Sequence, residues 1–171
     1  MWAHAAALAW WNQVQDGILW TCSKCVGEAT ERAMLGGIYG AREAADFAGR
    51  NPMLVVNMDD GGSNIWRIAR ELEKAVWDCH VWGVAASAGL IVTCACRGHR
   101  TCGERACFLF HSVDERHPEA EDQQRAEWFA ARTTQPVEFW LELCEQGDTI
   151  FRAEEALAWG VVHEIIGADA P

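Results

Sequence analysis

Short apolar runs alternate with stretches of helical periodicity along most of the chain. The apolar runs predict buried strands at residues 18–22, 53–58, 79–85, 107–110 and 161–166. The stretches between and after them predict helices at about 31–47, 65–76, 88–96, 135–145 and 153–159. Strands that alternate with helices favour an α/β fold with a largely parallel sheet.

The predicted helices differ in how much of their surface is apolar. The helix at 65–76 carries Ile65, Ile68, Leu72 and Val76 on one side, which predicts one buried face. The helix at 88–96 is apolar all round and is expected to lie inside the molecule. Residues 113–127 are rich in charge and predict an exposed loop that enters a solvated helix, and residues 97–100 predict a turn.

Length and composition predict one globular domain over residues 1–171. Half of the 171 residues are hydrophobic, which is typical of a folded chain with a sizeable core. The longest apolar runs are too short or too interrupted for a membrane span. Residues 1–17, where an N-terminal helix is predicted, show no basic region ahead of their apolar part, so we expect a cytoplasmic protein without a secretory signal.

The charge balance is strongly acidic. Lysine and arginine number 14 against 25 acidic residues, for a formal net charge of −11. Binding to nucleic acid or to an anionic membrane is driven by basic patches, so we expect neither as a partner.

Eight cysteines raise the alternatives of a disulfide framework or a metal site. Cys22 and Cys25 have CxxC spacing, but no second pair matches it, and Cys94 and Cys96 fall on the helix expected to be buried. The favoured interpretation is that the cysteines act as small buried hydrophobic residues, with no metal and no cofactor. The ten tryptophans are expected to fill the core and interfaces.

The segment from Gly83 to His111 carries the strongest chemical signal. Ser87 lies between small residues, where a strand turns into a helix, and this context makes a serine a candidate nucleophile. The next predicted strand ends at His111, a candidate base. Taken alone, Ser87 could simply begin a helix and His111 could be an ordinary residue at a strand end.

A glycine pair follows the strand at 53–58. Gly61 and Gly62 could turn a backbone N–H toward a ligand. From the local sequence alone, a strand-to-helix turn capped by Ser63 is the favoured explanation of the pair.

Several of these motifs together resemble the proteolytic subunit of the Clp protease, the ClpP family. The segment Gly83-Val-Ala-Ala-Ser87-Ala-Gly89 resembles the family's Gly-x-Ala-Ala-Ser-x-Gly nucleophile turn, and Leu109-Phe-His111 resembles the strand that ends on its histidine. The segment that begins at Asp148 and runs through Gly160 is similar to the family's Asp-x-x-x-x-Ala-x-Glu-Ala-x-x-x-Gly segment, and Gly61-Gly62-Ser63 resembles its Gly-Gly turn. The matches span residues 18 to 166 in the family's order.

The resemblance implies an α/β fold of the ClpP/crotonase type, with a mostly parallel sheet built from repeated β-β-α and βα units and flanking helices. It implies a serine endopeptidase in which Ser87 is the nucleophile, His111 the base and Asp148 the residue that orients the histidine. The backbone N–H groups of Gly62 and Ala88 would form the oxyanion hole. The implied substrates are peptides or unfolded proteins, and the implied partners are further copies in a homo-oligomer, with a ring and an ATP-driven AAA+ unfoldase as further expectations.

The chain departs from the family in places that keep other functions open. Asp59 and Asp60 stand where the family has Ser-Pro, residues 112–147 form a shortened handle-like helical region, and the extension that forms axial loops is not recognisable. Phage head-maturation proteases and signal-peptide peptidases of the same fold are alternatives. A crotonase-type acyl-CoA enzyme that uses Asp59 and Asp60 is another, as is a catalytically silent oligomeric subunit or interaction protein.

Overall fold

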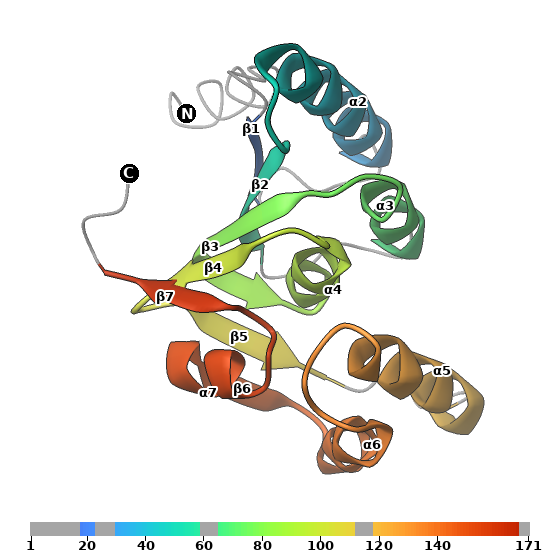
Figure 1. The fold of residues 1–171 in the computed structure, drawn as a ribbon. Helices are drawn as coiled ribbons and strands as arrows, with labels where there is room; N and C mark the ends of the chain where they lie inside the picture. The colour runs from blue at the N-terminus through green and yellow to red at the C-terminus, as the bar shows by residue number, and fades with distance from the viewer. Residues whose placement is uncertain (1–17, 23–29, 59–64, 112–117, 168–171) are drawn as a thin grey trace, which may run out of the picture.

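A computed structural model describes residues 18–22, 30–58, 65–111 and 118–167, and these residues form a mixed α/β fold around a sheet (Figure 1). The strands are β1 (Ile18–Cys22), β2 (Met53–Met58), β3 (Asp78–Ala86), β4 (Arg100–Gly103), β5 (Cys107–Phe110), β6 (Thr149–Arg152) and β7 (Glu164–Ile166). The helices are α2 (Thr30–Ala48), α3 (Ile65–Leu72), α4 (Ala88–Ala95), α5 (Pro118–Ala130), α6 (Val137–Gln146) and α7 (Ala153–Ala158).

The sheet is mostly parallel and divides at β3. Its main path runs β1-β2-β3-β4-β7, and β5 pairs with β3 and with β6. On one side β3 pairs with β2. On its other side the first half of β3 pairs with β4 and the second half pairs with β5. Only the β5–β6 pair among these strands is antiparallel. Because β3 and β5 are parallel, the residues that follow them meet at one edge of the sheet.

Helices α2, α3 and α4 stack along one face of the sheet, and α5 and α6 lie side by side near its lower end (Figure 1). The core between these layers contains large side chains that are fully buried, among them Trp77, Trp140, Phe108, Phe110 and Phe129. Helix α4 is buried along its whole length, as its apolar sequence predicts. Such packing fixes the two strands and the helix that surround the candidate site.

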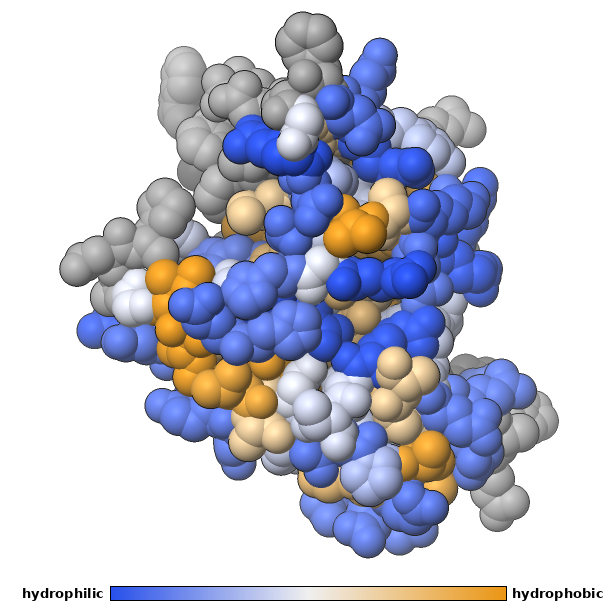
Figure 2. Space-filling model, in the orientation of Figure 1, coloured by the Kyte–Doolittle hydropathy of each residue, from blue (hydrophilic) through white to orange (hydrophobic). Residues whose placement is uncertain are grey.

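Hydrophilic side chains cover most of the face drawn in Figure 2, with one larger apolar patch at the left of the view and smaller apolar spots elsewhere. The large hydrophobic side chains that remain exposed are Tyr39, Val76, Trp82, Ile150 and Leu157. No helix in the described part of the chain is long and apolar enough to cross a membrane.

The structure confirms most predicted elements and corrects others. The strands at 18–22, 53–58 and 107–110 lie where the pattern predicts them, whereas the predicted turn at 97–100 runs into β4, and β6 was not predicted at all. The predicted helix extends to Val76, but α3 ends at Leu72. Val76 therefore lies beyond the helix and is 48% exposed. The last strand begins only at Glu164, because the amides of Val161 and Val162 donate to the Ala156 carbonyl instead of to a strand. The predicted N-terminal helix lies outside the described residues.

Candidate active site

Ser87 stands at a sharp turn between β3 and α4. Its φ of 52° and ψ of −110° make it the one non-glycine residue with positive φ among the described residues. The Ser87 N–H donates to the carbonyl of Leu109 on β5 at 3.0 Å, and its carbonyl accepts from Leu90 and Ile91 at 3.1 and 3.2 Å. A backbone in this region costs on the order of 1–3 kcal/mol and persists only where its surroundings enforce it. Here both the neighbouring strand and the helix hold the turn, which presents the serine side chain at the edge of the sheet.

Small residues allow α4 to leave this turn close to the sheet. A Cβ atom added at Gly89 would lie 2.7 Å from the Met58 carbonyl oxygen at the end of β2. Ala85, Ala86 and Ala88 around the serine are buried as well. The run of small residues therefore serves close backbone packing, which places the first turn of α4 beside the ends of β2 and β3.

His111 follows β5 and meets Ser87 across the edge of the sheet. Its Nε2 lies 2.7 Å from the Ser87 Oγ, and both residues are half-buried. The Ser87 hydroxyl can donate to Nε2 when the ring proton is on Nδ1. A nucleophile and a base within hydrogen-bond reach are the first requirement for an activated serine. The structure thus brings together two residues that are 24 positions apart in the sequence.

Asp148 is the third residue expected in the site. It is exposed and immediately precedes β6, whose Thr149 pairs with Phe110. Continuing that register by one residue would set Asp148 opposite His111. Between these two described residues, however, the structure contains no hydrogen bond and no ion pair. The serine and the histidine are therefore in contact. Asp148 follows the same register, one residue before the paired Thr149, and has no bond to the His111 ring.

Of the two predicted oxyanion donors, the structure describes one. Ala88 is the first residue of α4, so its N–H has no acceptor within the helix. No other described residue accepts from that amide, which leaves it able to donate to a bound oxygen beside Ser87. Gly62, like Asp59 and Asp60, lies outside the described residues.

A cavity of about 460 Å³ opens beside the serine and the histidine. Most of the described residues that line it are apolar, and Arg125 and Glu121 from α5 add charge: the lining set is Ile65, Trp66, Ser87, Leu90, Ile91, Leu109, Phe110, His111, Glu121, Arg125 and Phe129. Arg125 was not predicted as a site residue because residues 113–127 read as a solvated segment. The signal that would have found it is its position, four residues before the buried Phe129 on the inner side of α5.

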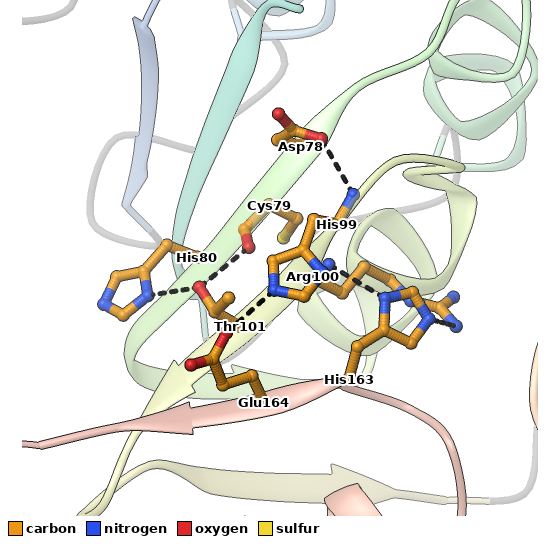
Figure 3. Close-up of polar contacts among 8 residues, drawn as sticks. All are labelled: Asp78, Cys79, His80, His99, Arg100, Thr101, His163 and Glu164. Atoms are coloured by element: carbon orange, nitrogen blue, oxygen red, sulfur yellow. Dashed lines mark hydrogen bonds and ion pairs between the residues drawn. The ribbon is translucent and has the colours of Figure 1, made fainter.

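A second polar cluster, drawn in Figure 3, lies at the other end of β3. Arg100 is buried there, and its guanidinium donates to the carbonyls of Cys94, Arg132 and Gly160 at 2.7 to 3.3 Å. The Arg100 N–H donates to Nδ1 of His163 at 3.2 Å, and His99 Nε2 lies 3.0 Å from Glu164. Partial burial, with the charge of Arg100 and then His99, lowers the pKa of His163. This cluster joins α4, β4 and the segment before β7, and we interpret it as structural.

The described cysteines fit the interpretation of small buried hydrophobic residues. Free thiols that are buried are found at Cys79, Cys94, Cys96, Cys102 and Cys144, whereas the free thiol of Cys107 is half-buried. Burial raises the pKa of Cys94 and of Cys102 to about 11, so both thiols stay protonated at neutral pH. Cys25, the second member of the CxxC pair, lies outside the described residues.

Comparison with known proteins extends only to the fold. No family model and no curated protein matches the sequence. Many solved structures share the fold, and two of them serve as examples. One is a peptidase from Plasmodium falciparum, with a TM-score of 0.72 and 12% sequence identity, and the alignment covers 90% of this chain and 96% of the peptidase. The other, described as an enzyme, has a TM-score of 0.72, 14% identity and the same coverage.

Proposed function

We propose that this protein is a serine endopeptidase of the ClpP-like type. The observation that carries the proposal is the 2.7 Å contact between Ser87 Oγ and His111 Nε2 at a strained turn between β3 and α4. The cavity beside this pair and the shared fold with a solved peptidase support the same conclusion.

In the proposed reaction, Ser87 Oγ attacks the carbonyl carbon of a peptide bond while His111 Nε2 takes the hydroxyl proton. The Ala88 N–H donates to the oxygen that becomes negative, together with Gly62 as expected from the sequence. His111 then gives its proton to the leaving amine, and the C–N bond breaks to leave an acyl-serine. Water then attacks the ester carbonyl while His111 takes a proton from it, and His111 returns this proton to Ser87 Oγ as the C–O bond breaks, which releases the acid and restores Ser87.

We assign Asp148 the role of holding the His111 ring in the tautomer that accepts from serine. The role requires the exposed Asp148 side chain to move toward His111. Catalytic hydrogen bonds are often long in the absence of substrate and shorten on binding, so an unengaged aspartate is compatible with this role.

Hydrolysis of an unfolded protein substrate and of a mixed fluorogenic peptide set tests the proposal. Wild type should cleave the substrates at internal bonds, Ser87→Ala should not, and Ser23→Ala, a matched serine change without an assigned role, should retain full activity. Equal activity in wild type and Ser87→Ala would refute the assignment. An inactive but folded wild type would favour the silent subunit.

We further propose that the protein assembles as a homo-oligomer. Ile150 on β6, which is 66% exposed, and Leu157 on α7, which is 42% exposed, give neighbouring elements an uncovered apolar surface. Light scattering at working concentration should show a mass above that of one chain, and a clean monomer would refute assembly while leaving the chemistry untouched.

A further inference from the structure

The cavity beside Ser87 continues into a second hollow between α3 and α5. This second hollow has a volume of about 440 Å³ and shares Trp66, Glu121 and Arg125 with the first. It adds Arg70 from α3 and Trp128 from α5. A peptide that binds at Ser87 and extends along these helices therefore passes Arg125 first and Arg70 next.

Arg125 is a buried cation whose donors are mostly unused. The residue is only 6% exposed, and its guanidinium carbon lies 4.8 Å from the centre of the Phe110 ring. Its one hydrogen bond among the described residues goes from Nη2 to the Cys144 sulfur at 3.7 Å, and its Nε has no acceptor. Asp122 Oδ1 lies 3.5 Å from Nη2 and forms no hydrogen bond. Since a guanidinium has five N–H donors and sulfur is a weak acceptor, most of its donor capacity is unfilled.

Arg100 provides an internal comparison for a buried arginine. It is 5% exposed, much like Arg125, and its Nε also lacks an acceptor, but its Nη1 and Nη2 atoms donate to three carbonyl oxygens. Burying a cation is costly unless hydrogen bonds compensate it, and the fold supplies them to Arg100 but not to Arg125. The difference suggests that the compensating oxygens for Arg125 come from a ligand in the cavity that it lines.

The remaining charges define what that ligand should be. Arg70 and Glu121 are both exposed at the second hollow, Glu121 also lines the first, and Asp122 is paired with Arg125 at 3.5 Å. Two arginines along one cleft are unexpected in a chain with a formal charge of −11. The apolar walls formed by Ile65, Leu90 and Phe129 would suit the methylene stem of a side chain that ends in a carboxylate.

We propose that the site selects acidic peptides, with a glutamate side chain in the cavity on the acyl side of the cleaved bond. The carboxylate would accept charge-assisted hydrogen bonds from Arg125, and Arg70 would favour a second acidic residue farther along the cleft. This inference rests on the proposed peptidase function, because it fixes the substrate class of the same serine.

Four fluorogenic peptides that differ only in the residue before the cleaved bond, Glu, Gln, Leu or Lys, provide the test. Wild type should cleave the Glu peptide with a kcat/KM about 10-fold or more above that of the isosteric Gln peptide. Arg125→Met should lower kcat/KM for the Glu peptide about 30-fold and change kcat/KM for the Leu peptide by less than about 3-fold. Arg125→Lys should retain part of the preference for the Glu peptide over the Gln peptide. Arg105→Met, an exposed arginine outside the cleft, serves as the matched control. A preference for Leu in wild type, or an equal loss on all four peptides in both Arg125 variants, would overturn the inference.

A binding assay distinguishes failure of acidic recognition from failure of the proposed peptidase function. Fluorescence anisotropy of the same peptides on Ser87→Ala should show tighter binding of the Glu peptide, and the preference should vanish in Ser87→Ala with Arg125→Met. Preferential binding without cleavage by wild type would refute the peptidase and support acidic recognition. Cleavage by wild type without a Glu preference in either assay would refute acidic recognition and support the peptidase.

Discussion

The two ends of β3 each carry a histidine in a polar cluster, but their surroundings differ. At the carboxyl end, His111 contacts Ser87 at 2.7 Å, the serine backbone is strained and a cavity of about 460 Å³ lies beside the pair. At the amino end, His163 contacts Arg100 at 3.2 Å, and the buried arginine is bonded to three carbonyls. The first cluster presents a nucleophile to a cavity, whereas in the second the Nη atoms of the buried arginine donate to backbone carbonyls of the fold itself. A polar contact to histidine therefore indicates chemistry only where strain, access and a nucleophile coincide.

The largest expected effect is a loss of peptide hydrolysis on substitution in the Ser87–His111 cluster, which substitution in the Arg100–His163 cluster should not cause. Ser87→Ala and His111→Gln should each lower kcat/KM for peptide hydrolysis by at least about 1,000-fold, because each removes a member of the reacting pair. Urea denaturation should show little change in stability for either variant. His163→Gln should retain activity per folded molecule, and a comparable loss in that variant would abolish the distinction between the clusters.

Asp148→Asn tests whether the site is a triad or a pair. If Asp148 fixes the His111 tautomer, the amide should lower kcat about 1,000-fold without changing the fold. Glu145→Gln, an exposed acid at the end of α6, is the matched control. Full activity of Asp148→Asn would show that Asp148 is not the residue that orients His111.

Arg100→Met should act on stability and not on the chemistry. The change removes the donors of three carbonyls and should lower the free energy of unfolding by about 3 kcal/mol. Chemical denaturation measures this loss, and hydrolysis corrected for the folded fraction should stay near wild type. Unchanged stability would show that the cluster does not hold its part of the fold together.

Gly89→Ala should damage the packing of the candidate site. Its new Cβ would lie 2.7 Å from the Met58 carbonyl, so α4 must shift at a cost of about 2 kcal/mol. Gly36→Ala in α2 is the control: a Cβ there meets nothing within 4 Å, and alanine should stabilise the helix by about 0.5–1 kcal/mol. Equal effects of the two changes in thermal unfolding would contradict this account of the small residues.

The smallest effect is a pH dependence of stability that arises at the structural cluster. Partial burial, the charge of Arg100 and that of His99 lower the pKa of His163 in the folded state, so the unfolded chain binds a proton more readily. Stability should therefore fall as pH drops below the unfolded value of about 6.5 and should be fully present above it. His163→Gln should reduce this slope in urea titrations at pH 8 and pH 5.5. Burial also lowers the pKa of His80, so part of the slope should remain.

The sequence predicted the parts of this molecule that follow from local pattern. The apolar runs located β1, β2 and β5, and the small residues around Ser87 located the turn. The strands β4 and β6 were missed because each is short and carries an arginine and a threonine, whereas the equally short β5 is a continuous apolar run. Pairing with β3 and β5 defines them, and such long-range contacts leave little trace in a short segment.

The candidate site likewise contains residues that the sequence identified and one that it did not. Ser87 and His111 were identified from a motif and a strand end, and the structure places them in contact. Arg125 was missed because it lies in a charge-rich segment, where its spacing of four residues from Phe129 is the one sequence signal that sets it apart from its solvated neighbours. Burial of a single charged residue depends on the packing of α5 against the sheet, which local sequence does not specify.

Labelling with a fluorophosphonate tests the central claim most directly, because it reports on an activated serine without any assumption about substrate. Intact-mass measurement of the folded protein should show one adduct in wild type, located at Ser87 by peptide mapping. Ser87→Ala should show none, and His111→Gln should react at least about 100-fold more slowly. A folded, assembled wild type that does not react, or a His111→Gln variant that reacts as fast as wild type, would contradict the assignment of Ser87 and His111 as nucleophile and base.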